Sequence, residues 1–143
     1  AVLRNPQATR PWQHVLEPLR GYLMLAENLY TAGPAFAEAW NFGPHADDAR
    51  PVEWIVSQLA EKWGDGAHWQ IDGGEHPHEA GYLKLDIAKA AHGLSWHPAL
   101  RLAEALDLIV DWARCAQAGG DLRTLTQAQI LAYQLRVSTS HLS

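Results

Sequence analysis

The sequence of 143 residues predicts a helix-rich α/β fold in a single domain. Three observations predict this class. Apolar residues recur at helical spacing in several segments. The stretches of strand character between them are too short to build a large sheet by themselves. Glycine-proline and glycine-glycine pairs separate the segments, as turns do. The length, with 48% hydrophobic and 19% charged residues, is typical of one globular domain, which we assign to residues 1–143.

Two short apolar and aromatic stretches open the chain, at residues 1–4 and 10–15. Asn5 and Pro6 between them have the chemistry of a turn. The two stretches are therefore expected either to pair as a small hairpin or to extend a larger sheet. Because the chain opens at Ala1 within strand-like sequence, we interpret it as a processed or truncated product.

The first helix is expected to begin near Pro18, since a first helical turn tolerates the missing N–H of proline. Its apolar stripe consists of Leu19, Leu23, Ala26 and Tyr30, with Tyr22 and Leu29 beside it. Gly21 inside the helix costs about 1 kcal/mol relative to alanine. This cost indicates that a neighbouring backbone approaches closely at Gly21. Gly33 and Pro34 end the helix.

The middle of the chain alternates between short strands and one helix. Residues 39–42 and 69–72 are interpreted as strands, and a further strand is expected at 82–85. A helix begins at Pro51 and stops at Gly64. The residues that share its apolar face are Val52, Ile55, Leu59 and Trp63.

The C-terminal part is expected to be helical. Asp86 starts a short helix by accepting hydrogen bonds from its first N–H groups. A longer helix follows, and its predicted buried stripe is Leu102, Leu106, Ile109 and Ala113, with Val110 and Trp112 beside it. Gly119 and Gly120 interrupt the pattern. Residues 126–135 are predicted to form a last amphipathic helix, within a tail at 121–143 whose role the sequence leaves open.

Composition excludes several function classes. The net charge is −5 and the eleven Lys and Arg residues are scattered, so a nucleic-acid partner is not expected. The apolar runs are far shorter than the roughly 20 residues of a membrane helix, so no membrane partner is expected. Cys115 is the single cysteine, which excludes an internal disulfide and a cysteine-based zinc site. A reducing, cytoplasmic location fits this usage.

The loop at residues 75–79 is dense in ionisable groups. Pro77 favours an extended backbone, in which His76 and His78 point the same way and could bind a divalent metal. A third ligand would have to come from elsewhere, and we assign no metal. Histidines and an arginine could instead bind a phosphate. The third interpretation is a solvated polar loop with one buried, hydrogen-bonded histidine.

Arg10 is the second candidate for anion binding. The Pro11-Trp12 pair that follows holds the chain stiff, so the planar guanidinium could contact a phosphate with two donors. The alternative is a surface arginine packed across Trp12 or paired with Glu17. His14, in an apolar context, is interpreted as a structural residue rather than a catalytic base. The seven tryptophans are interpreted as gap-filling core residues, with a stacking platform for bases or sugars as the alternative.

Several catalytic signatures are missing from the sequence. No glycine-rich phosphate loop follows a strand, so there is no dinucleotide-binding fingerprint. No Gly-x-Ser-x-Gly motif occurs, and Cys115 has no nearby histidine to activate it. Residue pattern by itself therefore indicates a helix-rich α/β domain with a candidate anion site, and we assign no catalytic residue.

Ordered blocks of the sequence nevertheless stand out together between the N-terminus and about Trp112. They are RNP at 4–6, ATRPWQHVLEPL at 8–19, AWNFGP at 39–44, PVEWIV at 51–56, WQID at 69–72, EHPHEA at 75–80 and YLKLD at 82–86. As a set they resemble CDP-glucose 4,6-dehydratases, members of the extended short-chain dehydrogenase/reductases. The chain looks like the C-terminal, substrate-binding lobe of such an enzyme.

The resemblance implies a parent lyase that converts CDP-glucose to CDP-4-keto-6-deoxyglucose, a precursor of sugars in bacterial surface polysaccharide such as O-antigen. In such enzymes NAD takes hydride from the sugar 4-position, water leaves across the 5- and 6-positions, and hydride returns at the 6-position. NAD and the Tyr-x-x-x-Lys pair belong to an N-terminal Rossmann domain. Tyr82 and Tyr133 lack a lysine at that spacing. The chain itself is therefore expected to bind no NAD and to be inactive.

The resemblance also implies site residues and partners. Arg10 occupies the place of an arginine that contacts the diphosphate of a sugar nucleotide in related enzymes. His76 stands where many relatives have a second arginine, and His78 and Glu79 are included as neighbours. The expected partners are a CDP-sugar, the missing Rossmann domain and a second copy of the chain. The second copy is expected to associate through exposed apolar faces, and this association would bury Trp12, Leu19 or Leu23.

Two further hypotheses come from other functional classes. The chain could be a free-standing module that binds a nucleotide or sugar phosphate, with Arg10 and His76 contacting the anion. It could also be an interaction protein that pairs with a separately encoded Rossmann subunit. Binding of CDP by the chain alone would favour the first of these hypotheses.

Overall fold

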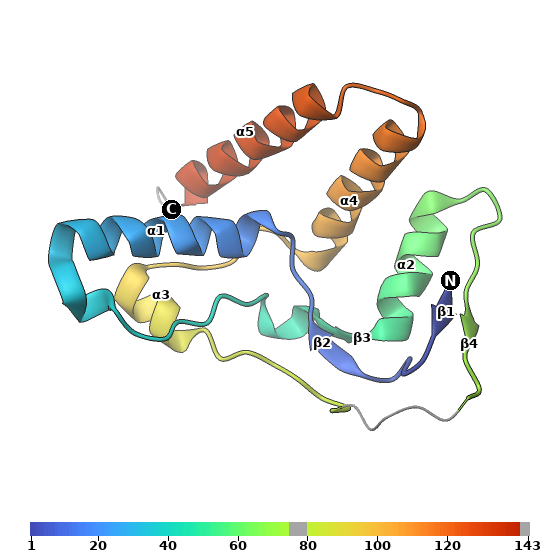
Figure 1. Ribbon diagram of the computed structural model, residues 1–143, viewed down its shortest axis with the longest axis horizontal. Helices are drawn as coiled ribbons and strands as arrows, with labels where there is room; N and C mark the ends of the chain where they lie inside the picture. The colour runs from blue at the N-terminus through green and yellow to red at the C-terminus, as the bar shows by residue number, and fades with distance from the viewer. Residues whose placement is uncertain (75–79, 141–143) are drawn as a thin grey trace.

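A computed structural model describes residues 1–74 and 80–140. Helices dominate this structure, and its strands are two or three residues long, which confirms the helix-rich expectation. Figure 1 shows α1 and α3 on one side of the molecule and α2 and α4 on the other, with α5 lying across from α4 towards α1. None of the helices among these residues has the length and apolar character needed to cross a bilayer.

The strands pair with segments far away in the sequence. β1 (Val2–Leu3) pairs in parallel with β4 (Gln70–Ile71), and β2 (Thr9–Pro11) pairs antiparallel with β3 (Ala49–Pro51). The hairpin considered for the first two stretches is therefore wrong. Each stretch finds a partner about 40 to 70 residues further on, and that choice depends on tertiary packing rather than on the turn between them.

Helix α1 (Leu16–Ala32) begins as expected, with Pro18 in its first turn, and it is followed by the 3-10 turn η1 (Gly33–Phe36). Gly21 is buried in α1 because the ring of Phe42 lies against it. A Cβ atom built at Gly21 would stand 2.5 Å from a carbon of that ring. The close approach predicted at Gly21 is thus present, but it comes from an aromatic side chain and not from a backbone.

Residues 39–42 do not form the predicted strand. Their aromatic side chains pack instead. Trp40 stacks on Phe36 with ring centroids 6.1 Å apart, and Phe42 meets Trp96 edge to face at 5.0 Å. The large side chains that alternate at residues 39–42, a pattern typical of a strand, instead pack into a hydrophobic core. Its buried members are Phe42, Ala90, Leu94 and Trp96, with Met24, Leu25, Phe36, Trp40 and Ile87 packed against them.

A second core lies between α2 (Val52–Trp63) and α4 (Leu102–Gln117). It consists of Ile55, Leu102 and Leu106, with Trp12, Trp54 and Leu59 packed against them. The predicted helix from Pro51 to Gly64 is confirmed, and Gly64 stops it with a φ of 68°. The two cores contain four of the seven tryptophans, which supports their interpretation as core residues.

The predicted stripe of α4 is half right. Leu102, Leu106 and the flanking Val110 are buried as predicted, but Ile109 and Trp112 are exposed. Ala105, which was not predicted, is buried as well, because α4 packs against both α2 and α5. At the start of this helix the Glu104 carboxylate accepts a hydrogen bond from the Arg101 N–H at 2.8 Å.

The remaining helices are α3 (Ala88–Leu94) and α5 (Leu122–Ser140). Asp86 accepts a hydrogen bond from the Ala88 N–H at 2.8 Å, which confirms its expected capping role. The predicted strand at 82–85 is reduced to one bridge between Tyr82 and Thr9. The last helix is longer than predicted, so most of the tail at 121–143 is a helix that contacts α4.

The apolar stripe of α1 faces outward. Leu19 is 46% exposed, Leu23 is 73% exposed and Tyr30 is 92% exposed. The exposed apolar face expected on the first helix is therefore present. Trp12 differs from that expectation, because it is partly buried against the second core and its indole N–H donates to the Arg50 carbonyl at 2.9 Å.

Candidate functional site

The candidate site is built on β2, which has a neighbour on each side. β3 pairs with one edge of β2. On the other edge, the Thr9 N–H donates to the Gly81 carbonyl at 2.9 Å and the Leu83 N–H donates to the Thr9 carbonyl at 3.1 Å. β2 is thus the middle of a small ribbon, and Arg10 lies at its centre.

The Arg10 guanidinium is held by backbone oxygens. Its Nη1 donates to the carbonyl of Thr9 at 2.9 Å and to the carbonyl of Ala80 at 2.8 Å. Ala80 directly follows residues 75–79, so Arg10 lies beside one end of the ionisable segment. Its predicted partners His76, His78 and Glu79 lie outside the described residues, as does the metal alternative for that segment. The diphosphate role of Arg10 stays a prediction.

Arg50 lies directly opposite Arg10 in the ribbon. The register pairs the two residues across β2 and β3, and each is followed by a proline. Directly opposed residues of an antiparallel pair project to the same face. The Arg50 guanidinium stacks over Trp54, with its carbon 5.4 Å from the ring centroid. Sequence reasoning missed Arg50, although the repeated Arg-Pro pair at 10–11 and 50–51 was a usable signal.

A buried carboxylate anchors the chain just before β3. Asp48 lies in the 3-10 turn η2 (Ala46–Asp48), where it pairs with the Arg101 guanidinium at 3.2 Å. Asp48 also accepts a hydrogen bond from the Leu102 N–H at 3.3 Å. These contacts connect the entry to β3 with the start of α4, so the ribbon that holds Arg10 and Arg50 is tied to the second core.

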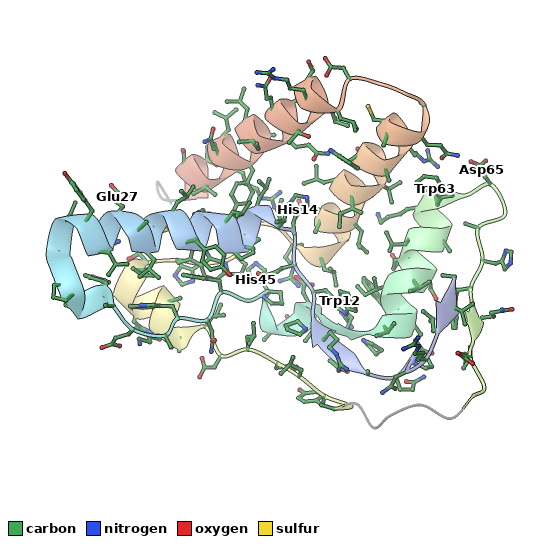
Figure 2. All side chains as sticks on the ribbon, viewed as in Figure 1. Trp12, His14, Glu27, His45, Trp63 and Asp65 are labelled. Atoms are coloured by element: carbon green, nitrogen blue, oxygen red, sulfur yellow. The ribbon has the colours of Figure 1, made fainter. Side chains whose placement is uncertain are left out.

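His14 lies where the chain passes from β2 into α1 (Figure 2). It is buried, and its Nδ1 accepts a hydrogen bond from the Leu16 N–H at 3.3 Å. Burial lowers the pKa of His14, which favours the neutral imidazole that this acceptor role requires. The structural interpretation of His14 fits this geometry.

Glu17 is 1% exposed and connects three parts of the fold. Its Oε1 accepts from the N–H groups of Ala99 at 2.9 Å and Leu100 at 2.7 Å, and its Oε2 accepts from the Tyr133 hydroxyl at 2.8 Å. Burial and the neighbouring Glu17 carboxylate raise the pKa of Tyr133. Glu17 is therefore a structural anchor for α1 and α5, so it is not the partner considered for Arg10.

Two apolar pockets lie away from the ribbon. One, of about 250 Å³, lies between the start of α1, α4 and α5, and a groove of about 550 Å³ runs between α1 and α5. The groove is lined mainly by Leu16, Leu19, Leu23, Ile130, Tyr133 and Val137. Across residues 1–74 and 80–140, no cluster of three or more His, Cys, Asp or Glu side chains could hold a metal.

Comparison with known proteins relates the chain to a curated enzyme. No family model matches the chain. The chain is 50% identical over 132 residues to a CDP-glucose 4,6-dehydratase of Salmonella typhimurium. The match covers 92% of this chain and 37% of the length of that protein. The resemblance inferred from the sequence blocks is confirmed, and the coverage is consistent with a C-terminal portion.

Proposed function

We propose that the chain is the C-terminal, sugar-nucleotide-binding lobe of an NAD-dependent CDP-glucose 4,6-dehydratase of the extended short-chain dehydrogenase/reductase family. The observation that carries this proposal is the 50% identity across 92% of the chain. The reaction of the intact enzyme converts CDP-glucose to CDP-4-keto-6-deoxyglucose for surface polysaccharide, in the cytoplasm. The substrate-binding lobe is one domain, to which α5 belongs as well.

The residues of this chain do not fit NAD. The sequence has no glycine-rich turn between a strand and a helix. The one parallel strand pair that the described residues form, β1 with β4, is two residues long. NAD therefore belongs to an N-terminal Rossmann domain in this proposal, and the chain alone is inactive.

The role of the chain is to bind and orient the diphosphate of the CDP-sugar. Arg10 is the proposed phosphate donor, because an arginine presents several N–H groups in one plane and keeps its charge at all physiological pH values. The bonds of its Nη1 to two carbonyls support this role, since they limit the positions that the guanidinium can adopt. His76, His78 and Glu79 are proposed to lie around the same phosphates.

The outer face of α1 is the proposed contact with the Rossmann domain. Exposed large apolar side chains cluster on this helix at Leu19, Tyr22, Leu23 and Tyr30. Such a cluster is costly in water and is typical of a surface that another body covers. In the isolated chain, the same face is expected to promote association between copies.

A chimera tests the proposal. The matching 132-residue segment of the Salmonella dehydratase is replaced by this chain, and turnover of CDP-glucose is measured. We expect the chimera to form the 4-keto product and the isolated chain to form none. A chimera that folds and binds NAD but does not turn over CDP-glucose would contradict the proposal.

Two measurements on the isolated chain separate the proposal from its alternatives. Calorimetric binding of CDP that is much tighter than binding of inorganic pyrophosphate would favour a free-standing module, because the cytidine pocket is expected to need the N-terminal domain as well. Specific capture of a separately encoded Rossmann subunit in a pull-down would favour an interaction protein.

A further inference from the structure

The ribbon of β2 and β3 places two like charges opposite each other. Arg10 and Arg50 are paired in the register, and directly opposed residues have Cβ atoms about 4.5–5.5 Å apart on the same face of the sheet. Like charges at such positions destabilise a strand pair. The arrangement is unusual in a chain with a net charge of −5, in which an acidic partner at position 50 would be easy to supply.

Arg50 is held in place without a carboxylate. Within the part of the chain that the structure describes, its guanidinium makes no ion pair and its contact is the ring of Trp54. Trp54 packs against the second core, and the Arg50 carbonyl accepts the Trp12 indole N–H. A cation stacked on a fixed ring keeps its outward N–H groups available to a ligand.

The two guanidinium groups have partners on different segments. Arg10 donates to the Ala80 carbonyl, on the edge of β2 away from β3, whereas Arg50 stacks on Trp54 of α2. Two charges that start from opposed positions but contact different segments suit an anion with two linked charged groups better than a single small anion. A diphosphate has that form, with donors required at both phosphates.

We propose that Arg50 is a second phosphate-binding residue, which acts with Arg10 on the two phosphates of a nucleoside diphosphate. This assignment rests on the proposed function and deepens it. Neither the family resemblance nor the sequence reasoning placed a residue of β3 at the diphosphate. Arg50 would supply a fixed positive charge for the second phosphate.

The test is an NMR titration of the full 143-residue chain with inorganic pyrophosphate, and separately with inorganic phosphate. The indole N–H signals of Trp12, which donates to the Arg50 carbonyl, and of Trp54, which stacks on the Arg50 guanidinium, report on binding at Arg50. We expect saturable binding that is tighter for pyrophosphate. Arg50→Gln should weaken pyrophosphate binding about tenfold or more, since a hydrogen bond to a charged group contributes about 1.5–3 kcal/mol.

Matched variants make the result specific. Arg123→Gln removes the same charge from an exposed position on α5 and should leave pyrophosphate affinity within twofold. Arg50→Lys keeps a cation beside Trp54 but lacks the planar fork, so its affinity should lie between those of wild type and Arg50→Gln. Thermal melting of each variant checks that the fold is kept.

Each outcome decides the assignment. Unchanged affinity in Arg50→Gln, with a loss in Arg10→Gln, overturns the role of Arg50 and leaves the proposed function standing. Absence of saturable pyrophosphate binding by the wild-type chain overturns the two-arginine site. An inactive chimera together with binding that depends on both arginines overturns the proposed function while the anion site survives.

Discussion

The two faces of α1 differ from those of an ordinary surface helix, because apolar side chains lie on both of them. The inner face buries a carboxylate and a glycine, Glu17 and Gly21. The outer face carries Leu19, Leu23 and Tyr30, all well exposed. A surface helix normally turns its apolar stripe to the core and its charges to water.

Because of this difference, the apolar stripe of α1 does not identify the core of this chain. The inner face is held by specific contacts, the Phe42 ring on Gly21 and the hydrogen bonds to Glu17. The outer face has large apolar side chains and little to cover them. Under the proposed function, the Rossmann domain covers that face. The inner face of α1 then packs within this chain, and the outer face packs against the other domain.

Among the substitutions that test the two faces of α1, removal of the Glu17 carboxylate should have the largest effect on the free energy of unfolding. Glu17→Ala leaves three donors without their acceptor, at about 1–3 kcal/mol for each one that stays buried. We expect a loss of about 3 kcal/mol or more in the free energy of unfolding, measured by urea denaturation. Glu27→Ala, at an exposed position of the same helix (Figure 2), should change it by less than about 0.5 kcal/mol.

The glycine on the inner face gives the second test. In most helices Gly→Ala stabilises by about 0.5–1 kcal/mol. Gly21→Ala should instead destabilise by about 1–3 kcal/mol, because the new methyl group overpacks against Phe42. The double variant Gly21→Ala with Phe42→Leu should recover part of the loss in the same melts. A stabilising Gly21→Ala would show that the inner face is loosely packed.

The outer face should show the smallest effect in the isolated chain. Leu23→Ala removes an exposed side chain and should change the free energy of unfolding by less than about 0.5 kcal/mol. It should also reduce self-association, measured by sedimentation velocity over a range of concentrations. In the chimera the same substitution should cost about 2 kcal/mol or more, as for a buried leucine. Equal effects in both proteins would mean that the face stays uncovered.

Local sequence signals predicted the helices well. The start of α2 after Pro51, its stop at Gly64 and the cap supplied by Asp86 depend on residues within one or two turns of the chain. For the site, the motif around Arg10 placed that residue on a short strand leading into a helix, as the structure has it. These features were predictable because the interactions that cause them are local.

Pairing and burial were not predictable in the same way. The repeated Arg-Pro pair at 10–11 and 50–51 draws attention to Arg50 but does not show that Arg10 and Arg50 are partners in the ribbon. Nothing near Gly21 in the sequence indicates that Phe42 fills the space there. The alternation at 39–42 favoured a strand, yet the aromatic side chains pack into a core and the backbone finds no strand partner. Such choices depend on which distant segments meet.

By itself the sequence determined where several helices begin or end and which enzyme family the chain resembles, because turn chemistry, caps and ordered motifs are properties of neighbouring residues. Only the tertiary structure decided that Glu17 is buried, that the stripe of α1 faces outward and that Arg10 lies opposite Arg50. The physical reason is that burial and strand register follow from contacts between segments tens of residues apart.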